Sequence, residues 1–260
     1  MTIILAVWCG LFGLAIGSFL NVVIWRVPRG ESVVRPPSHC PGCDSEIAKR
    51  DNIPVVSWIL LGGRCRNCGT RISLRYPAVE LLTGALFAVI ALKIGAHIEL
   101  VAYLWLAAVG VALAAIDLDL HRLPDSLTLP SYLVGITVFA IAVAVDGDAW
   151  SLARAAIGMV ALFAFYFAVV LAYPRGMGFG DVKLAGVLGL FLGWLGWDQL
   201  VVGAFLAFLI GGFVSIGLVM FGGAGRKTAV PFGPFMLVGA MIGIFAGSGI
   251  GSAYTSILSH

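Results

Sequence analysis

Two aspartates, Asp117 and Asp181, are the residues whose type and position most strongly suggest chemistry. Each lies where a long apolar segment meets a short polar stretch, in AAIDLDLHRLPD and in GMGFGDVKL. A carboxylate at the edge of a lipid bilayer is costly unless it is paired, solvated or used. Two close carboxylates can share one proton, so that one acts as a base on water and the other as an acid towards a carbonyl. The pair therefore predicts peptide hydrolysis without a metal or a covalent intermediate.

The predicted helix ends suggest separate roles for the two carboxyl groups. Asp181 precedes an apolar segment and should lie at a helix N-terminus, which favours its anion. Asp117 follows an apolar segment and should lie at a C-terminus, which favours its neutral form. Of the nearby carboxylates, we expect Asp119 to be solvated or to cap a helix. Asp125 reads as an N-terminal helix cap, although it remains a rival member of the pair.

The residues before Asp181 predict an irregular backbone. Gly176, Gly178 and Gly180 occupy every second position, which disfavours a helix and lets a substrate strand approach closely. Irregular backbone at membrane depth is tolerated only inside protein or beside a water-filled cavity. We therefore expect Gly178 and Gly180 to form a loop that supports the active site. Lys183 is expected to pair with Asp181 or with a lipid phosphate.

Two Cys-x-x-Cys pairs predict a second site. Cys40 and Cys43 form the first pair, Cys65 and Cys68 form the second, and 21 residues separate the pairs. Four thiolates in two such turns can close a tetrahedral structural zinc site, whose metal would supply much of the folding energy of a small loop. Two disulfides or four free thiols are the alternatives. His39 is either a substitute ligand or a solvated side chain.

The composition indicates a membrane protein. The 260 residues are 60% hydrophobic and 11% charged, whereas soluble domains carry about 25% charged residues. A segment of roughly 17 to 25 apolar residues can cross a bilayer. We therefore expect an all-α polytopic membrane protein with about eight transmembrane helices. The predicted spans are 3–24, 78–95, 100–116, 127–145, 152–173, 182–197, 199–221 and 233–257. The last span also carries a stripe of small residues suited to close helix packing, at Gly239, Gly243, Gly247 and Gly251.

The basic residues orient these spans. Cytoplasmic loops carry an excess of Lys and Arg, and the segment 25–77 contains nine of the sixteen basic residues. Placing it in the cytoplasm brings five more to the same side: Arg122, Arg175, Lys183, Arg226 and Lys227. Asp117 and Asp181 then both lie at the cytoplasmic membrane boundary, where a reducing environment also argues against disulfides. Because the basic residues follow the topology, the net charge of +3 does not indicate a nucleic-acid partner, and anionic lipid of the inner leaflet is the expected electrostatic partner.

Six segments together resemble the bacterial type 4 prepilin leader peptidases, also called prepilin peptidase/N-methyltransferases. They are GSFLNVVIWRVPRG (17–30), the paired Cys-x-x-Cys loop, NIPVVSW (52–58), RYPAVELLTG (75–84), IDLDLHRLPD (116–125) and GFGDVKL (178–184). The resemblance implies a first transmembrane helix over 1–24, a cytoplasmic four-cysteine domain over 25–77 and a seven-helix membrane aspartic peptidase domain over 78–260.

The resemblance also implies an activity. Such enzymes lie in the bacterial inner membrane and face the cytoplasm, where they cut the basic leader from membrane-embedded prepilins and pseudopilins of type IV pilus and type II secretion systems. The two family aspartates match Asp117 and Asp181. Bifunctional members then methylate the new N-terminus with S-adenosylmethionine, and the complete cysteine loop favours both activities here. No residue can be assigned to S-adenosylmethionine from the sequence.

Two other classes of protein share some of these features. A transporter or proton-coupled channel would use intramembrane aspartates to relay ions, normally near the middle of the membrane and beside broken helices. A non-enzymatic membrane anchor could bind a partner through the cysteine loop, but this leaves the glycines around Asp181 unexplained.

Overall fold

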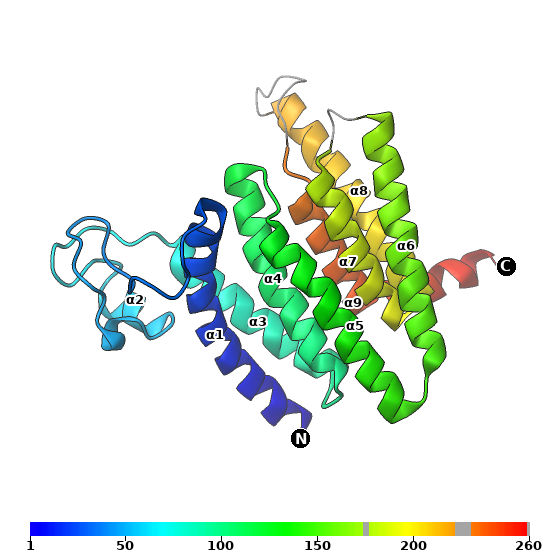
Figure 1. Ribbon diagram of the computed structural model, residues 1–260, viewed down its shortest axis with the longest axis horizontal. Helices are drawn as coiled ribbons and strands as arrows, with labels where there is room; N and C mark the ends of the chain where they lie inside the picture. Colours follow the sequence, from blue (N-terminus) through cyan, green and yellow to red (C-terminus); the bar gives the residue numbers. More distant parts are fainter. Residues whose placement is uncertain (174–176, 222–229, 259–260) are drawn as a thin grey trace. The chain divides into compact units, whose positions relative to one another are not determined.

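The computed structural model describes residues 1–173, 177–221 and 230–258, and within these it is helical, without β-strands (Figure 1). Two isolated β-bridges, His39 with Glu46 and Arg64 with Arg71, lie in the cysteine loop. The helices are α1 (Thr2–Arg26), η1 (Val27–Arg29), η2 (Lys49–Asp51), α2 (Val56–Leu60), α3 (Arg75–Ile94), α4 (Glu99–Leu120), α5 (Asp125–Asp146), α6 (Ala149–Ala172), α7 (Phe179–Leu195), α8 (Trp197–Phe221) and α9 (Gly233–Leu258). The eight long helices confirm the predicted all-α fold.

Seven of the long helices are long and apolar enough to cross a membrane, so the protein is a multi-pass membrane protein. The eighth, α7, has only 17 residues. It is nevertheless the most enclosed helix, because every residue from Leu184 to Trp194 is buried. Its neighbours are α5, α6, α8 and α9. Helix α7 is thus surrounded by protein rather than by lipid, which suits a short, glycine-rich segment.

The chain forms two compact units, an N-terminal unit (Met1–Ala112) and a C-terminal unit (Leu113–His260). Helix α4 begins in the first and ends in the second. The sequence suggested a different division, into 1–24, 25–77 and 78–260, which was based on expected function and not on contacts. That division stays a prediction.

Glycine allows close helix contact in the N-terminal unit. Helices α1 and α3 pack along their length. A Cβ atom added at Gly17 would lie 2.7 Å from the Cα atom of Glu80, so only glycine permits this approach. The short distance between the helices allows many backbone van der Waals contacts, as in other small-residue helix pairs.

Glycine also allows close helix contact in the C-terminal unit. A Cβ atom at Gly193 on α7 would lie 2.8 Å from the Arg154 carbonyl on α6. On α9, a Cβ atom at Gly239 would lie 2.6 Å from the Gly203 carbonyl on α8. The predicted packing role of the glycine stripe is confirmed at Gly239. Arg154 also donates from Nε to the Gly193 carbonyl at 2.7 Å, which places a cation at the C-terminal end of α7.

Candidate functional site

Asp117 is held inside α4 and points at the start of another helix. It lies three residues before the end of α4 at Leu120, and its side chain is only 5% exposed. Its Oδ2 atom accepts a hydrogen bond from the backbone N–H of Gly233 at 3.0 Å, and Gly233 is the first residue of α9. The predicted span ended at 116, but α4 continues past Asp117 and so fixes its backbone.

Gly233 is a site residue that the sequence did not reveal. A Cβ atom added there would lie 2.7 Å from Asp117 Oδ2 and 3.2 Å from Leu123 Cδ2. A side chain at this position would therefore push against the carboxylate that the Gly233 amide binds. The available signal was the glycine within PFGPF at the start of the last apolar segment, but nothing local linked it to Asp117.

Asp181 lies in the first turn of α7, and its side chain binds the residue that precedes the helix. Its Oδ2 atom accepts a hydrogen bond from the Gly178 N–H at 3.0 Å. Its own N–H donates to the Gly178 carbonyl at 3.1 Å. The carboxylate thus satisfies an amide that the helix leaves free, as the acidic residue of a capping box does. Asp181 is 9% exposed.

The expected glycine loop is wrong at Gly180. Helix α7 begins at Phe179, so Gly180 is helical, and only Gly178 has an extended conformation, with φ −85° and ψ 157°. Gly176 lies outside the described residues. The physical reason is that the bond between Asp181 and the Gly178 N–H offsets the low helix propensity of glycine.

Leu123 brings the two aspartates into one site. A Cβ atom at Gly180, next to Asp181, would lie 3.1 Å from the Leu123 Cβ atom. The same leucine contacts Gly233, the residue that binds Asp117. Leu123, in the turn between α4 and α5, therefore lies close both to the start of α7 and to the start of α9.

Both carboxyl groups meet the positive end of a helix dipole. Asp181 lies at the start of α7, as predicted, but Asp117 reaches the start of α9 with its side chain although its backbone is near the end of α4. Helix ends alone therefore do not distinguish the two groups. Within the described residues, neither Oδ1 atom has a hydrogen-bond partner, so each carboxyl group has one atom fixed and one available to a ligand.

Lys183 joins α7 to α5. Its Nζ atom lies 2.7 Å from both carboxylate oxygens of Asp125 and 5.2 Å from the ring centroid of Phe179. The expected pairing of Lys183 with Asp181 is therefore wrong, and its contact with a lipid phosphate stays a prediction. Asp125 is also not the cap of α5, since Pro124 holds that position and Asp125 is the first helical residue. Asp125 is thus exposed and paired with a cation, whereas Asp117 is buried and bound by a backbone amide.

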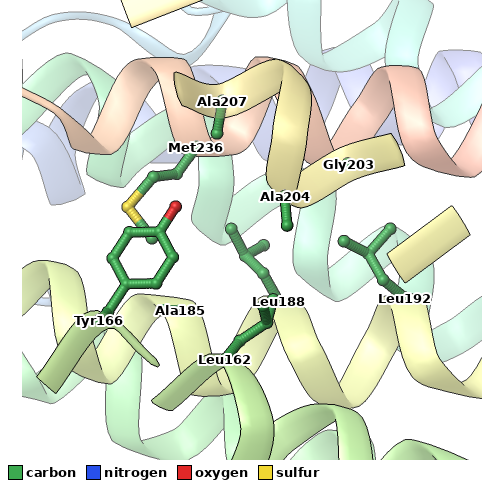
Figure 2. A pocket seen from close by; sticks show the side chains of 9 residues that line it. All are labelled: Leu162, Tyr166, Ala185, Leu188, Leu192, Gly203, Ala204, Ala207 and Met236. Atoms are coloured by element: carbon green, nitrogen blue, oxygen red, sulfur yellow. The ribbon is translucent and has the colours of Figure 1, made fainter. Parts of the chain in front are cut away.

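A small cavity lies in the C-terminal unit, between α6, α7, α8 and α9 (Figure 2). Tyr166 and Met236 both line it, and the rest of the lining is apolar. The cavity measures about 10 Å³, which is close to the least that one water molecule needs. It is therefore too small to receive a peptide.

The four predicted metal ligands meet in the N-terminal unit. The Sγ atoms of Cys40, Cys43, Cys65 and Cys68 all lie within 4.8 Å of one another. Those of Cys40 and Cys68 are 3.7 Å apart. Tetrahedral zinc with Zn–S bonds of about 2.3 Å requires S–S distances of roughly 3.8 Å. The cluster therefore fits a tetrahedral metal ion, and none of its thiols forms a disulfide.

The two Cys-x-x-Cys turns repeat one backbone pattern. In the first, Cys40 N–H donates to Ser45 O and Asp44 N–H donates to Cys40 O, at 3.0 and 2.8 Å. In the second, Cys65 N–H donates to Thr70 O at 2.9 Å, and Gly69 N–H to Cys65 O at 3.0 Å. Each turn needs a left-handed residue four positions after its first cysteine, with φ 56° at Asp44 and φ 70° at Gly69.

Hydrogen bonds prepare the second cysteine pair to act as thiolates. The Thr70 hydroxyl, 3.2 Å from Sγ, together with the Thr70 amide lowers the pKa of Cys68 to about 6. The backbone N–H groups of Cys68 and Asn67 lower the pKa of Cys65. Metal ligands must be deprotonated, so these donors suit a metal site. Cys9 lies apart in α1 and is half-buried.

An ion pair secures the second turn to the rest of the loop. Arg66 donates from Nε and Nη2 to the two carboxylate oxygens of Asp51, at 2.9 and 2.6 Å. This bidentate contact with Arg66 lowers the pKa of Asp51. Nearby, Trp58 Nε1 donates to the Ile72 carbonyl at 3.2 Å. These side chains connect parts of the segment 25–77 independently of a metal.

Comparison with known proteins agrees with this arrangement. Residues 11–94 match the Bacterial Peptidase A24 N-terminal domain, and residues 100–216 match the Type IV leader peptidase family. A prepilin leader peptidase/N-methyltransferase from Aeromonas hydrophila is 39% identical over 92% of this chain and 90% of its own length. One from Neisseria gonorrhoeae is 38% identical over 95% and 93%.

The chain belongs to the type IV leader peptidase family. As in the sequence prediction, both aspartates lie in the segment that matches the type IV leader peptidase family, and the cysteine cluster lies in the segment that matches the N-terminal domain. Gly233 lies beyond both matched segments. No solved structure matches the chain.

Proposed function

We propose that this protein cleaves the leader peptide from membrane-embedded type IV prepilins or pseudopilins, with Asp117 and Asp181 as its catalytic pair. One observation carries the proposal. Two buried carboxyl groups from distant parts of the chain are each fixed through Oδ2 by a backbone amide at a helix start, and Leu123 lies next to both Gly180 and Gly233. The names of the relatives supply the substrate class.

The chemistry follows from a shared proton. One carboxylate removes a proton from water, whose oxygen attacks the scissile carbonyl carbon, while the other carboxylic acid donates its proton to the carbonyl oxygen. The tetrahedral intermediate collapses, the C–N bond breaks, and the leaving amine takes up a proton. Because the two groups titrate as a pair, the roles belong to the pair and not to one fixed residue.

The proposed site is the cytoplasmic face of the bacterial inner membrane. A prepilin holds its apolar N-terminal helix in the bilayer and its charged leader in the cytoplasm, so its scissile bond lies at the interface. Asp117 lies near the end of α4 and Asp181 in the first turn of α7, which suits a bond at that depth. The basic residues of the segment 25–77 support the cytoplasmic orientation. Arg175, Arg226 and Lys227, which entered the same argument, lie outside the described residues.

We extend the proposal to N-methylation of the new N-terminal residue, since the relatives carry that activity in their names. The four-cysteine cluster would hold zinc as a closed structural site. S-adenosylmethionine would supply the methyl group to the amine released by cleavage.

The test is to incubate a prepilin with wild type, Asp117→Ala and Asp181→Ala and to weigh the N-terminus of the product. We expect each variant to lose cleavage by about 10² to 10⁴-fold, and the double variant to lose little more, because the two groups act as a unit. Asp119→Ala, an exposed aspartate two residues from Asp117, is the matched control. Continued cleavage by both single variants would refute the protease proposal. A transporter would instead show no cleavage by wild type and an ion flux that Asp117→Ala and Asp181→Ala alter.

A further inference from the structure

A hollow in the N-terminal unit has no role in the chemistry described above. It has a volume of about 390 Å³, which falls in the range of roughly 300 to 1,000 Å³ of small-molecule sites. One wall is a face of α1, and the other walls come from the cysteine loop that follows it. The α1 residues are Ala15, Ser18, Phe19, Val22 and Arg26, and the loop residues lie within 33–38 and at Asn52 and Pro54. All of them fall inside the segment 11–94 that matches the N-terminal domain.

Arg26 gives the hollow an uncompensated positive charge. Its side chain is only 7% exposed. The guanidinium donates to the carbonyls of Ser32 at 3.0 Å and Pro37 at 3.5 Å, and no carboxylate pairs with it in the described part of the chain. A buried charge is normally paired, because losing its hydration is expensive. The guanidinium is therefore positioned to receive an anionic group of a ligand.

The remaining lining is mixed. Phe19 and Val22 offer apolar surface, and Pro36 and Pro54 face them from the loop. Hydroxyl and amide groups stand among them on Ser18, Ser38 and Asn52. Such a lining suits a ligand that combines a flat apolar ring, several hydroxyl groups and a carboxylate.

Packing with α3 does not explain this face of α1. The helices meet through Gly10, Gly13 and Gly17, where added Cβ atoms would contact α3. The hollow uses a separate set of positions, spaced at 15, 18, 19, 22 and 26, which share one side of a helix. Phe19 is nearly half exposed on that side. Helix α1 therefore has one face for packing and a second face that is available to a ligand.

We infer that this hollow binds S-adenosylmethionine, with Arg26 receiving the carboxylate of its amino-acid part and the apolar walls enclosing its adenine. The inference rests on the proposed methyl transfer, and it assigns the cofactor to residues of the N-terminal unit. Phe19 also offers an aromatic surface next to which a positive sulfonium is stabilised. Ser18, Ser38 and Asn52 supply partners for the ribose hydroxyls.

The test measures binding of S-adenosylhomocysteine, which cannot donate a methyl group, to the purified full chain by calorimetry. Val22→Trp fills the hollow without removing Arg26, and Arg26→Gln removes the charge. We expect each variant to weaken binding by at least about tenfold. Val22→Trp should do so by occupying the space, and Arg26→Gln by removing a charge-assisted contact. Matched controls are Val7→Trp, an exposed position on the same helix, and Arg29→Gln. Thermal unfolding checks that every variant is folded.

Several outcomes would overturn the inference. Affinity within about twofold of wild type for a folded Val22→Trp would do so, as would ultraviolet crosslinking of labelled S-adenosylmethionine to residues 113–260. So would release of bound phosphatidylglycerol by Val22→Trp at unchanged S-adenosylhomocysteine affinity, since the hollow would then hold a lipid headgroup. If wild type cleaves and methylates a prepilin while Val22→Trp binds normally, only the assigned site fails. If wild type neither binds nor methylates, the proposed methyl transfer fails as well.

Discussion

The cysteine cluster and the aspartate pair are built in opposite ways. Each Cys-x-x-Cys turn is complete within about six residues, because its backbone bonds join positions such as Cys40 and Ser45. The aspartate site joins α4, α7 and α9 through contacts between residues as far apart as Asp117 and Gly233. A metal can draw two local turns together, whereas the aspartates depend on helix packing already being in place.

The largest effect should follow loss of the metal. Structural zinc contributes on the order of 10 kcal/mol to folding of small metal-dependent modules, and the loop has little apolar core of its own. We expect wild type to contain one zinc per chain and Cys40→Ser to lose it. Limited proteolysis should then cut within 25–77 while 113–173 remains protected. Cys9→Ser is the control, because Cys9 lies outside the cluster.

Proteolysis confined to 25–77 would show that the cysteine loop depends on the metal and that the helices of the C-terminal unit do not. Equal protection of 25–77 with and without zinc would show that the loop folds without a metal. Cleavage throughout 113–173 after zinc loss would show that the C-terminal unit depends on the four-cysteine cluster.

A smaller effect should follow Gly233→Ala. The added Cβ atom would lie 2.7 Å from Asp117 Oδ2, so the carboxylate must move away from the α9 amide. Misplacing a reacting group by a fraction of an ångström should slow leader cleavage by about 10 to 100-fold. Prepilin cleavage assays measure this directly. Gly249→Ala in the same helix is the control, since nothing lies within 4 Å of a Cβ atom there. Equal rates for the two variants would show that the position of Asp117 is not critical.

The smallest effect should follow loss of the ion pair between Arg66 and Asp51 in the cysteine loop. Arg66 lowers the pKa of Asp51, so the folded value lies below the unfolded value. The pair therefore stabilises the fold at neutral pH, and this stabilisation is lost as the pH falls through the folded pKa. In Arg66→Gln, carboxyl NMR shifts should show the pKa of Asp51 returning towards about 3.9. Arg66→Lys should give an intermediate value, because lysine cannot make the bidentate contact. An unchanged pKa in both variants would show that Arg66 does not act on Asp51.

The sequence predicted the local features well. Apolar length located the eight long helices, including α7, which lacks the length of an ordinary span. The spacing of Cys40, Cys43, Cys65 and Cys68 predicted their cluster, because two short turns need few long-range contacts. The glycine spacing of α9 predicted its packing face, since residues four apart share one side of a helix.

The structure decided what depends on distant residues. The sequence determined that Asp117 and Asp181 are costly carboxylates near helix ends, because apolar patterning and residue type are local properties. It did not determine that Gly233 binds Asp117, that Lys183 pairs with Asp125, or that Gly180 is helical. Each of these depends on which helix ends meet in space, and one sequence pattern is compatible with several such meetings. Only tertiary packing selects among them.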